Sequence, residues 1–252
     1  MRPFHQTALF FLNHYVLPVF YPRHCPFCEE LLPYGHMICE SCQRKLPIIH
    51  GPSCYRCGKP LNDDRLELCY DCRIFPKSFE EGLSLFLYNN MMRHAIVSFK
   101  YHNQRYYADF FVHAILRMHL QKIKSWNLQA ILPVPVHKNK KKKRGYNQAA
   151  LLADQLAFYL NLPSYDDYII RKIDTIPQKQ FSPQARLNNL NQAFTLNPKY
   201  KTRQIPLRVM IIDDIYTSGA TMESCTRLLK SNGIHEVYIY SLCIGVARDE
   251  IL

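Results

Sequence analysis

The chain has 252 residues, of which 48% are apolar, and it can therefore bury one large domain and one small one. Its formal charge of +12 predicts an anionic partner such as a polyphosphate, a nucleic acid or a membrane surface. Eight of the ten cysteines form C-x-x-C pairs within residues 25–72, which indicates bound metal in a reducing compartment and argues against a disulfide-stabilised secreted protein.

The first 22 residues are predicted to form an apolar helix. The run Leu9–Phe20 contains Asn13, His14 and Pro18, and it is too short to span a bilayer as a helix. Its positive charge is weak and no small-residue cleavage site follows it, so it does not match a secretory signal. We expect this segment either to pack on the body of the protein or to contact a membrane surface, and we predict no transmembrane segment.

Residues 23–76 are predicted to form a zinc-ribbon module. Each C-x-x-C turn aims two thiolates at one point, and two turns complete a tetrahedral Zn²⁺ site with no open position for catalysis. The spacing favours two ribbons in series, holding one or two structural zinc ions, although pairing the first turn with the third satisfies the same spacing. The predicted ligands are Cys25, Cys28, Cys39 and Cys42 in the first ribbon, and Cys54, Cys57, Cys69 and Cys72 in the second.

Residues 79–252 show the alternation of strands and helices that is typical of an α/β domain. Alternating apolar residues predict a strand at residues 83–88, and helical spacing predicts helices at Met91–Phe99 and Gln104–Ile123. A buried strand is predicted at Ala130–Val136, and a helix that starts from an N-cap at Asn147 follows it. This order predicts a doubly wound parallel sheet with helices on both faces and a ligand at the carboxyl ends of its strands.

A basic loop, residues 137–148, connects that strand to its helix. It contains four consecutive lysines, Lys140–Lys143, followed by Arg144. The loop has three interpretations: a solvated surface loop, a clamp for pyrophosphate, or a contact for single-stranded DNA. A second polar stretch, residues 171–194, is rich in amides and is interpreted either as a flap over a ligand or as a surface loop without a role.

The stretch Leu207–Thr221 carries the strongest chemical signal. An apolar run is predicted to form a buried strand that ends at two adjacent acids, Asp213 and Asp214. A loop then leads into a helix, with Gly233 as its expected C-cap, and a second strand follows at Val237–Ile244. The apolar face of the predicted helix consists of Met222, Cys225, Leu228 and Leu229.

The loop between the acids and the helix predicts a sugar-phosphate site. The first N–H groups of a helix have no partner within the helix, and the helix dipole favours an anion there. The hydroxyls of Thr217, Ser218 and Thr221 add hydrogen-bond donors. The carboxylates of Asp213 and Asp214 suit the hydroxyls of a ribose or a hydrated Mg²⁺. One loop is therefore expected to hold a ribose 5-phosphate.

Residues Val209–Thr221, V-M-I-I-D-D-I-Y-T-S-G-A-T, resemble the signature of type I phosphoribosyltransferases, which bind 5-phosphoribosyl 1-pyrophosphate (PRPP). The resemblance implies that Asp213 and Asp214 hold the ribose or its Mg²⁺ and that the loop holds the 5-phosphate. The implied phosphate contacts are Thr217, Ser218, Gly219, Ala220 and Thr221. The implied pyrophosphate contacts are Val136, His137 and Lys138. If the chain is an enzyme, we expect Arg144 to draw charge onto the leaving pyrophosphate.

From Cys25 onward the chain resembles the ComF family of competence proteins. The resemblance rests on the cysteine pairs, on Phe99–Tyr101, on the P-V-P-V and R-G-Y-N-Q motifs before Ala149, on the polar stretch Thr175–Asn189, and on the Asp213–Thr221 loop. It implies a phosphoribosyltransferase-like protein that binds PRPP with Mg²⁺ and acts with incoming single-stranded DNA in natural transformation. It also implies a cytoplasmic location, at the inner face of the membrane, and a DNA-translocation helicase as a partner.

Two alternative functions stay open at this point. The chain could be a non-enzymatic adaptor that senses PRPP and binds DNA or protein partners. It could also be a metabolic phosphoribosyltransferase with an unidentified nitrogenous acceptor. No residue in the sequence stands out as a general base, so the residues leave open whether the chain catalyses a transfer.

Overall fold

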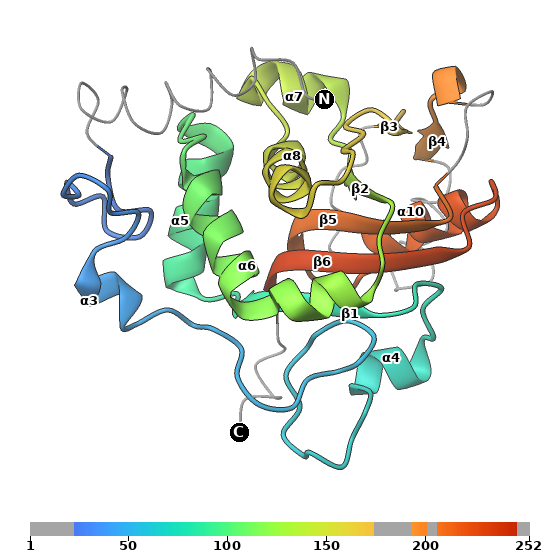
Figure 1. Ribbon diagram of the computed structural model, residues 1–252, viewed down its shortest axis with the longest axis horizontal. Helices are drawn as coiled ribbons and strands as arrows, with labels where there is room; N and C mark the ends of the chain where they lie inside the picture. Colours follow the sequence, from blue (N-terminus) through green and yellow to red (C-terminus); the bar gives the residue numbers. More distant parts are fainter. Residues whose placement is uncertain (1–22, 174–192, 201–205, 246–252) are drawn as a thin grey trace. The chain divides into compact units, whose positions relative to one another are not determined.

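The computed structural model describes residues 23–173, 193–200 and 206–245 of the chain (Figure 1). The predicted helix of residues 1–22 and most of the polar stretch, residues 174–192, lie outside the described residues. The chain divides into two compact units, Met1–Leu46 and Pro47–Leu252. The predicted module of residues 23–76 straddles this division, and its boundaries stay a prediction.

In the first unit, the described residues 23–46 form a small ribbon around four cysteines. His24 and Leu31 form an antiparallel bridge, and a one-turn helix, α3 (Glu40–Gln43), follows. Cys39 caps this helix, since its sulfur accepts a hydrogen bond from the backbone N–H of Cys42 at 3.4 Å. Such a short helix is not stable alone, so the ribbon depends on what its thiols bind.

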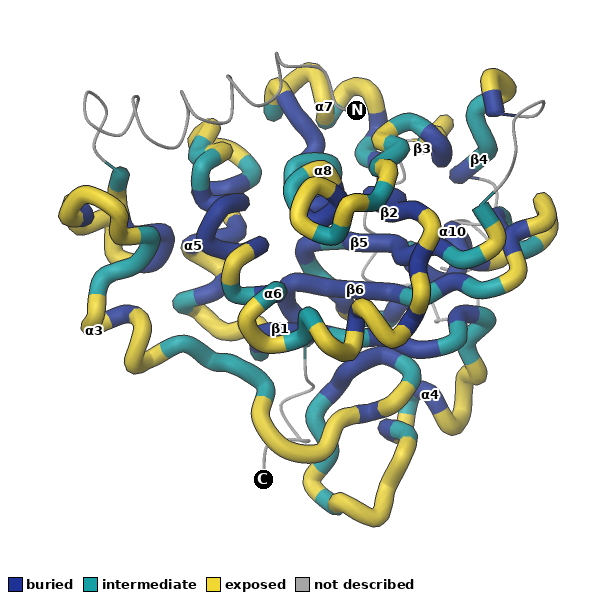
Figure 2. The backbone as a smooth tube through the Cα atoms, in the orientation of Figure 1, coloured by how far each residue is buried: buried dark blue, intermediate teal, exposed yellow. Residues whose placement is uncertain are grey.

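The second unit is built around a four-stranded parallel sheet, as the sequence predicts (Figure 1). The strands are β1 (Gly82–Leu87), β2 (Ala130–Pro133), β5 (Arg208–Tyr216) and β6 (Glu236–Ile244). Their order is β1-β6-β5-β2, so the last two strands of the chain form the centre of the sheet. Both central strands are mostly buried (Figure 2), which matches their continuous apolar sequences.

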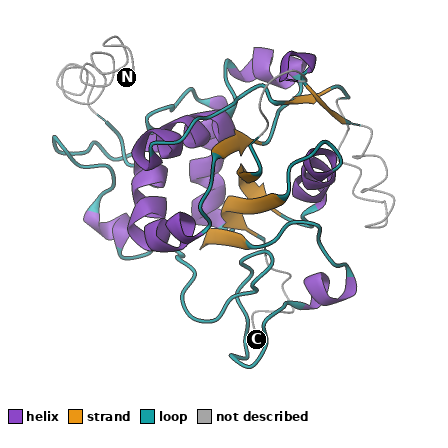
Figure 3. Cartoon of the chain, turned by 45° about the vertical axis from the view of Figure 1, so that its right-hand side comes forward, coloured by secondary structure: helices purple, strands orange, loops and turns teal. Residues whose placement is uncertain are grey.

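Helices lie on both sides of this sheet (Figure 3). They are α5 (Asn90–Tyr101), α6 (Tyr107–Ser125), α8 (Gln148–Leu160) and α10 (Ala220–Lys230). α10 buries Met222, Cys225 and Leu229 of the predicted apolar face, whereas Leu228 is half-buried. Asn147 is the N-cap of α8, as predicted, and accepts from the N–H of Ala149 at 3.2 Å. None of the described helices is both long and apolar enough to cross a membrane.

Smaller elements complete the second unit. The ribbon helix α4 (Tyr70–Ile74) precedes β1, and α7 (Lys138–Arg144) follows β2. A short hairpin pairs β3 (Ile169–Arg171) with β4 (Phe194–Leu196), so the polar stretch connects two antiparallel strands. A single 3₁₀ turn, η2 (Pro198–Tyr200), ends this part of the chain.

Three expectations about element boundaries are wrong. β5 continues past the acids, because its pairing with β6 extends to Tyr216, opposite Ile244. β2 ends at Pro133, short of Val136, and the prolines of this run mark the end of regular pairing, as expected. α10 ends at Lys230, three residues before Gly233, and Ser231 is its C-cap.

The basic segment is not a loop but contains the helix α7. His137 caps the start of α7, where its Nδ1 accepts from the N–H of Asn139 at 3.3 Å. Gly145 ends the helix with a φ of 81°, a left-handed conformation that suits glycine at this position. These two caps allow a short helix despite the repulsion between its lysines, and no residue of α7 is buried.

Candidate functional site

The two adjacent acids lie on opposite faces of β5. Side chains alternate along a strand, so Asp213 faces the side of α10 and Asp214 faces the side of α5. Asp214 is only 7% exposed, and its Oδ2 lies 2.5 Å from Nζ of Lys100, the next-to-last residue of α5. The backbone N–H of Asp214 donates to Oδ1 of Asp213 at 2.8 Å. The acids therefore form one charged centre with a lysine from another element.

Burial and mutual repulsion perturb this centre. Burial, followed by the charge of Asp214, raises the pKa of Asp213 to about 8, although Lys100 opposes the shift. Burial alone would lower the pKa of Lys100, but the charge and hydrogen bond of Asp214 outweigh it, and the net shift is upward. One lysine balances one carboxylate, and a further cation could bind the pair by displacing the proton that the raised pKa places on Asp213. Carboxylate oxygens are the ligands that Mg²⁺ prefers.

Lys100 is the member of this centre to which sequence reasoning gave no role. The Phe99–Tyr101 motif entered only through the family resemblance. A signal was present, because Lys100 follows Met92 and Ile96 at four-residue intervals on the buried face of α5. A lysine on the apolar face of a helix needs a buried partner, and the carboxylate of Asp214 is that partner here.

The predicted phosphate loop leads from β5 into α10. Gly219 is the N-cap of α10, with a φ of 72°, and a Cβ at this position would overlap the phenol oxygen of Tyr216. Glycine is therefore required twice, by the backbone conformation and by the close approach. Gly219 has no side chain to bond the first N–H groups of α10, so these groups can meet an anion. Thr217 is exposed, and Ser218, Ala220 and Thr221 are half-buried.

The basic segment lies after the strand next to the acids. β2 pairs with β5, with Pro133 opposite Ile212, and the N–H of Val134 donates to the carbonyl of Ile212 at 2.9 Å. Because β2 and β5 are parallel, the chain leaves β2 at the same carboxyl end of the sheet at which the acids lie. The segment begins with the predicted pyrophosphate contacts, of which Val136 is half-buried, His137 is buried and Lys138 is exposed.

Arg144, at the end of α7, is tied to α5. Its guanidinium donates to the phenol oxygen of Tyr101 at 2.9 Å and to Oε1 of Gln148 at 3.1 Å, and it lies 4.8 Å from the ring centroid of Tyr101. Gln148 in turn donates to the carbonyl of Lys100 at 3.4 Å. The R-G-Y-N-Q motif thus packs against the Phe99–Tyr101 motif. This places Arg144 beside the lysine that binds the acid pair.

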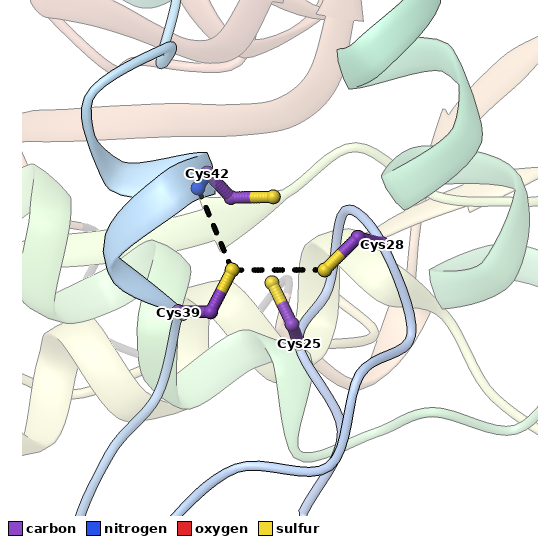
Figure 4. Close-up of side chains that lie close together, drawn as sticks. All are labelled: Cys25, Cys28, Cys39 and Cys42. Atoms are coloured by element: carbon purple, nitrogen blue, oxygen red, sulfur yellow. Dashed lines mark hydrogen bonds between the residues drawn. The ribbon is translucent and has the colours of Figure 1, made fainter.

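Both groups of four cysteines have the geometry of a zinc site. In each group the sulfurs all lie within 4.8 Å of one another, and Figure 4 shows the first group converging. Cys28 and Cys39 have sulfurs 3.6 Å apart, and Cys57 and Cys69 have sulfurs 3.7 Å apart. Four Zn–S bonds of about 2.3 Å in a tetrahedron place the sulfurs about 3.8 Å apart. The donor set fits structural Zn²⁺, and the turns pair in series, not interleaved.

The two sites differ in their surroundings. In the first site Cys28 is exposed and Cys39 is half-buried, whereas all four cysteines of the second site are buried. The second site shares a buried cluster with Tyr216, the last residue of β5. Burial and then the nearby cysteine thiolates raise the pKa of this tyrosine. The second site is therefore part of the core that supports the predicted phosphate loop.

Comparison with known proteins agrees with this architecture. A family model described as a double zinc ribbon domain matches residues 16–73. The chain is 29% identical to Competence protein F of Haemophilus influenzae, over 88% of this chain and 97% of that protein. It is 26% identical to Competence protein ComFC of Bacillus subtilis, over 81% of this chain and 82% of that protein. It is 27% identical to DNA utilization protein YhgH of Escherichia coli, over 88% and 97%.

These relatives are matched along most of their length and along most of this chain. The matched ribbon model, residues 16–73, includes both four-cysteine sites. The chain is therefore similar to competence protein F, ComFC and YhgH along most of its length, which supports the resemblance to the ComF family.

Proposed function

We propose that the chain binds PRPP with Mg²⁺ and acts in natural competence on or with incoming single-stranded DNA. The observation that carries the binding proposal is the position of the acid pair and the Gly219-capped helix at the carboxyl end of one strand. The printed names of the relatives, competence proteins and DNA utilization proteins, support the biological role. We further propose a cytoplasmic location at the inner face of the membrane and a helicase partner of the competence machinery.

In this proposal each part of the site has one task. The loop of residues 217–221 holds the 5-phosphate on the N-terminus of α10. Asp213 and Asp214 hold the ribose hydroxyls, and Mg²⁺, when bound, neutralises part of the ligand's negative charge. The segment Val136–Lys138 and the guanidinium of Arg144 face the pyrophosphate. Hydrogen bonds from Arg144 to Tyr101 and Gln148 fix its position before the ligand arrives.

The transfer that such a site supports breaks the bond between C1 of the ribose and the pyrophosphate oxygen, and a nitrogen of an acceptor attacks C1. Arg144 and Lys138 stabilise the charge that develops on the leaving pyrophosphate, while Asp214 and Asp213 keep the ribose in place. Catalysis then comes from positioning and electrostatics, with no covalent intermediate on the protein.

Calorimetry with PRPP and Mg²⁺, followed by ribose 5-phosphate, tests the binding proposal. We expect binding of both, with PRPP tighter because it also reaches the basic segment. Asp214→Asn should weaken binding at least about tenfold, since it removes a charge-assisted contact. Asp64→Asn, which changes an exposed aspartate of the second ribbon, is the matched control and should bind like the parent. Absence of binding by either sugar phosphate would reject the proposal.

A second candidate is the adaptor function, and the exposed face of α7 favours it. The lysines of α7 are solvent-accessible, and such a row of charges fits a nucleic-acid backbone better than it fits a single pyrophosphate. Pyrophosphate release with candidate nitrogenous acceptors separates the two functions. Turnover that Asp214→Asn abolishes supports an enzyme, including the metabolic alternative, whereas tight PRPP binding without turnover supports the adaptor.

The salt dependence of single-stranded DNA binding tests the role of α7. Changing Lys141, Lys142 and Lys143 to glutamine should reduce the slope of log K against log salt by about 2, because about 0.7 counterions are released per contact on a single strand. Lys124→Gln, at an exposed position of α6, is the control and should change the slope little. An unchanged slope in the triple variant would exclude α7 as the contact.

A further inference from the structure

The second four-cysteine site is built into the core of the unit Pro47–Leu252. Its four sulfurs belong to residues that are between 1% and 4% exposed. The same buried cluster contains Tyr216, together with Met222 and Cys225 of α10. The second site therefore shares one core with the end of β5 and with α10, which are the two elements that the loop of residues 217–221 connects.

Backbone contacts join this ribbon to β1. The N–H of Gly82 donates to the carbonyl of Tyr55 at 3.2 Å, and Oγ of Ser84 donates to the carbonyl of Cys57 at 3.2 Å. A Cβ on Gly58 would overlap the backbone of β1 at Leu83 and Ser84, so the ribbon turn lies directly on the strand. A movement of the C-x-x-C turn at residues 54–57 would thus displace the sheet edge.

The segment that leaves the ribbon also holds α10. Ser78 donates to Glu223 through its N–H at 2.8 Å and its Oγ at 2.7 Å, and Glu223 is only 2% exposed. Nε of Arg227 donates to the same carboxylate at 2.6 Å. Further along, Nζ of Lys230 lies 2.7 Å from Glu80. The residues between the second ribbon and β1 therefore fix one side of the helix whose N-terminus would bind the phosphate.

Tyr216 is the side chain that connects the metal site to the loop. It is 4% exposed and lies in the cluster with the four cysteines. Its phenol oxygen occupies the space that a Cβ on residue 219 would need. Gly219 has the left-handed conformation on which the loop turn depends. A shift of the cysteines that releases the ring of Tyr216 would remove the support of that turn.

We propose that zinc at the second four-cysteine site and anion binding at the phosphate loop are linked through Tyr216, which acts as a positioning residue. The identity of the bound anion, a sugar phosphate, rests on the proposed function. The link between the metal site and the loop does not depend on that identity. Coupling between two sites is reciprocal, so a bound sugar phosphate slows zinc loss by the factor by which zinc tightens sugar-phosphate binding, if zinc association is unchanged. Coupling energies of this kind correspond to factors of about 5 to 150.

The decisive experiment measures zinc release and amide exchange without any ligand. The full chain carrying Cys28→Ser lacks the first site, so the zinc taken up by a chromogenic chelator comes from the second. In this background we expect Tyr216→Leu to speed zinc release at least about fivefold. It should also speed hydrogen exchange of the amides of residues 217–221. Tyr240→Leu, which truncates a buried tyrosine of β6 outside the cysteine cluster, is the matched control and should change neither rate comparably.

Two further measurements keep the test decisive. If Tyr216→Leu does not fold, the Cys28→Ser protein is compared before and after zinc removal, and exchange at residues 217–221 should rise only on removal. Adding PRPP with Mg²⁺, or ribose 5-phosphate, should slow zinc release in that protein. If calorimetry shows binding but zinc release and loop exchange do not respond, the link is refuted and the proposed function stands. If no sugar phosphate binds, the ligand-free rates still decide the link.

Discussion

Replacing Lys100 with methionine tests whether the acid pair depends on a buried counter-ion. The side chains of Lys100 and Asp214 are 17% and 10% exposed, and their charged atoms lie 2.5 Å apart. At an effective dielectric constant of about 20 their attraction is about 6–7 kcal/mol, and the cost of withdrawing both charges from water offsets much of it. Methionine fills a similar volume, so the variant isolates the loss of the charge from the loss of packing.

The expected loss of stability follows from the cost of burying the Asp214 carboxylate without its counter-ion. Leaving one member of a buried pair uncompensated costs about 3–5 kcal/mol. The acid pair can escape part of this cost by taking up a proton, because the pKa of Asp213 is already raised, and the cost of protonating an ordinary aspartate at pH 7, about 4 kcal/mol, is the upper limit. We therefore expect Lys100→Met to lower the free energy of unfolding by about 3–4 kcal/mol at pH 7. At pH 5 the proton costs only about 1.5 kcal/mol, and the loss should shrink accordingly.

Urea denaturation of the zinc-loaded protein at the two pH values measures these losses. At pH 7 the midpoint of thermal unfolding should fall by roughly 6–16 °C for a chain of this size. Arg65→Gln is the matched control, because it breaks the exposed pair of Arg65 and Asp63 and should leave stability unchanged within error. The double variant Lys100→Met with Asp214→Asn should lose less than the sum of the two single variants. A loss below about 1 kcal/mol at pH 7, or an equal loss at pH 5, would contradict the reasoning.

Three other predictions follow from single features of the structure. In urea denaturation, Gly219→Ala should lose more stability than Gly51→Ala. Both glycines have a positive φ, but of the two only Gly219 has a neighbouring group that a Cβ would overlap. Equal losses would refute the overlap. Elemental analysis should find two zinc ions per chain. A chelator should remove them in two phases, the first from the site that contains the exposed Cys28. A single phase would show that the difference in burial between the two sites does not control zinc release. Burial lowers the pKa of His119, so its contribution to stability should decline as pH falls below about 6.5, where the unfolded chain takes up the proton first. His119→Gln should therefore reduce the difference in unfolding free energy between pH 7.5 and 5.5, and an identical difference in parent and variant would exclude this group.

The sequence predicted those parts of the fold whose signals are local. The alternation of apolar runs and helical spacing indicated the parallel sheet, and the caps at Asn147 and the turn at Gly219 follow from residue types that tolerate few other conformations. The boundary of β5 was misplaced, because acids usually end a buried strand and only the pairing with β6 explains why this one continues to Tyr216.

The parts that could not be predicted depend on contacts between distant residues. Identical C-x-x-C turns cannot show which turn pairs with which, since the choice depends on how the intervening chain folds. Lys100 and Asp214 are far apart in sequence, and their ion pair exists only because α5 packs beside the end of β5. The burial of the second cysteine group likewise comes from Tyr216 and α10, which no spacing within residues 54–72 reveals.

The order of the strands also constrains how the protein can be made. β1 and β2 are the outer strands of the described sheet. Within the described residues, their outer edges meet only single bridges, at Ile48 and Ser164, and their inner edges pair with central strands that the ribosome delivers after residue 207. Until β5 and β6 emerge, the inner backbone edges of the two outer strands have no partner strand, and their apolar side chains stay unprotected. The nascent chain is therefore expected to require a holding chaperone during most of its synthesis, and premature termination before β6 should yield an insoluble product and not a smaller folded domain.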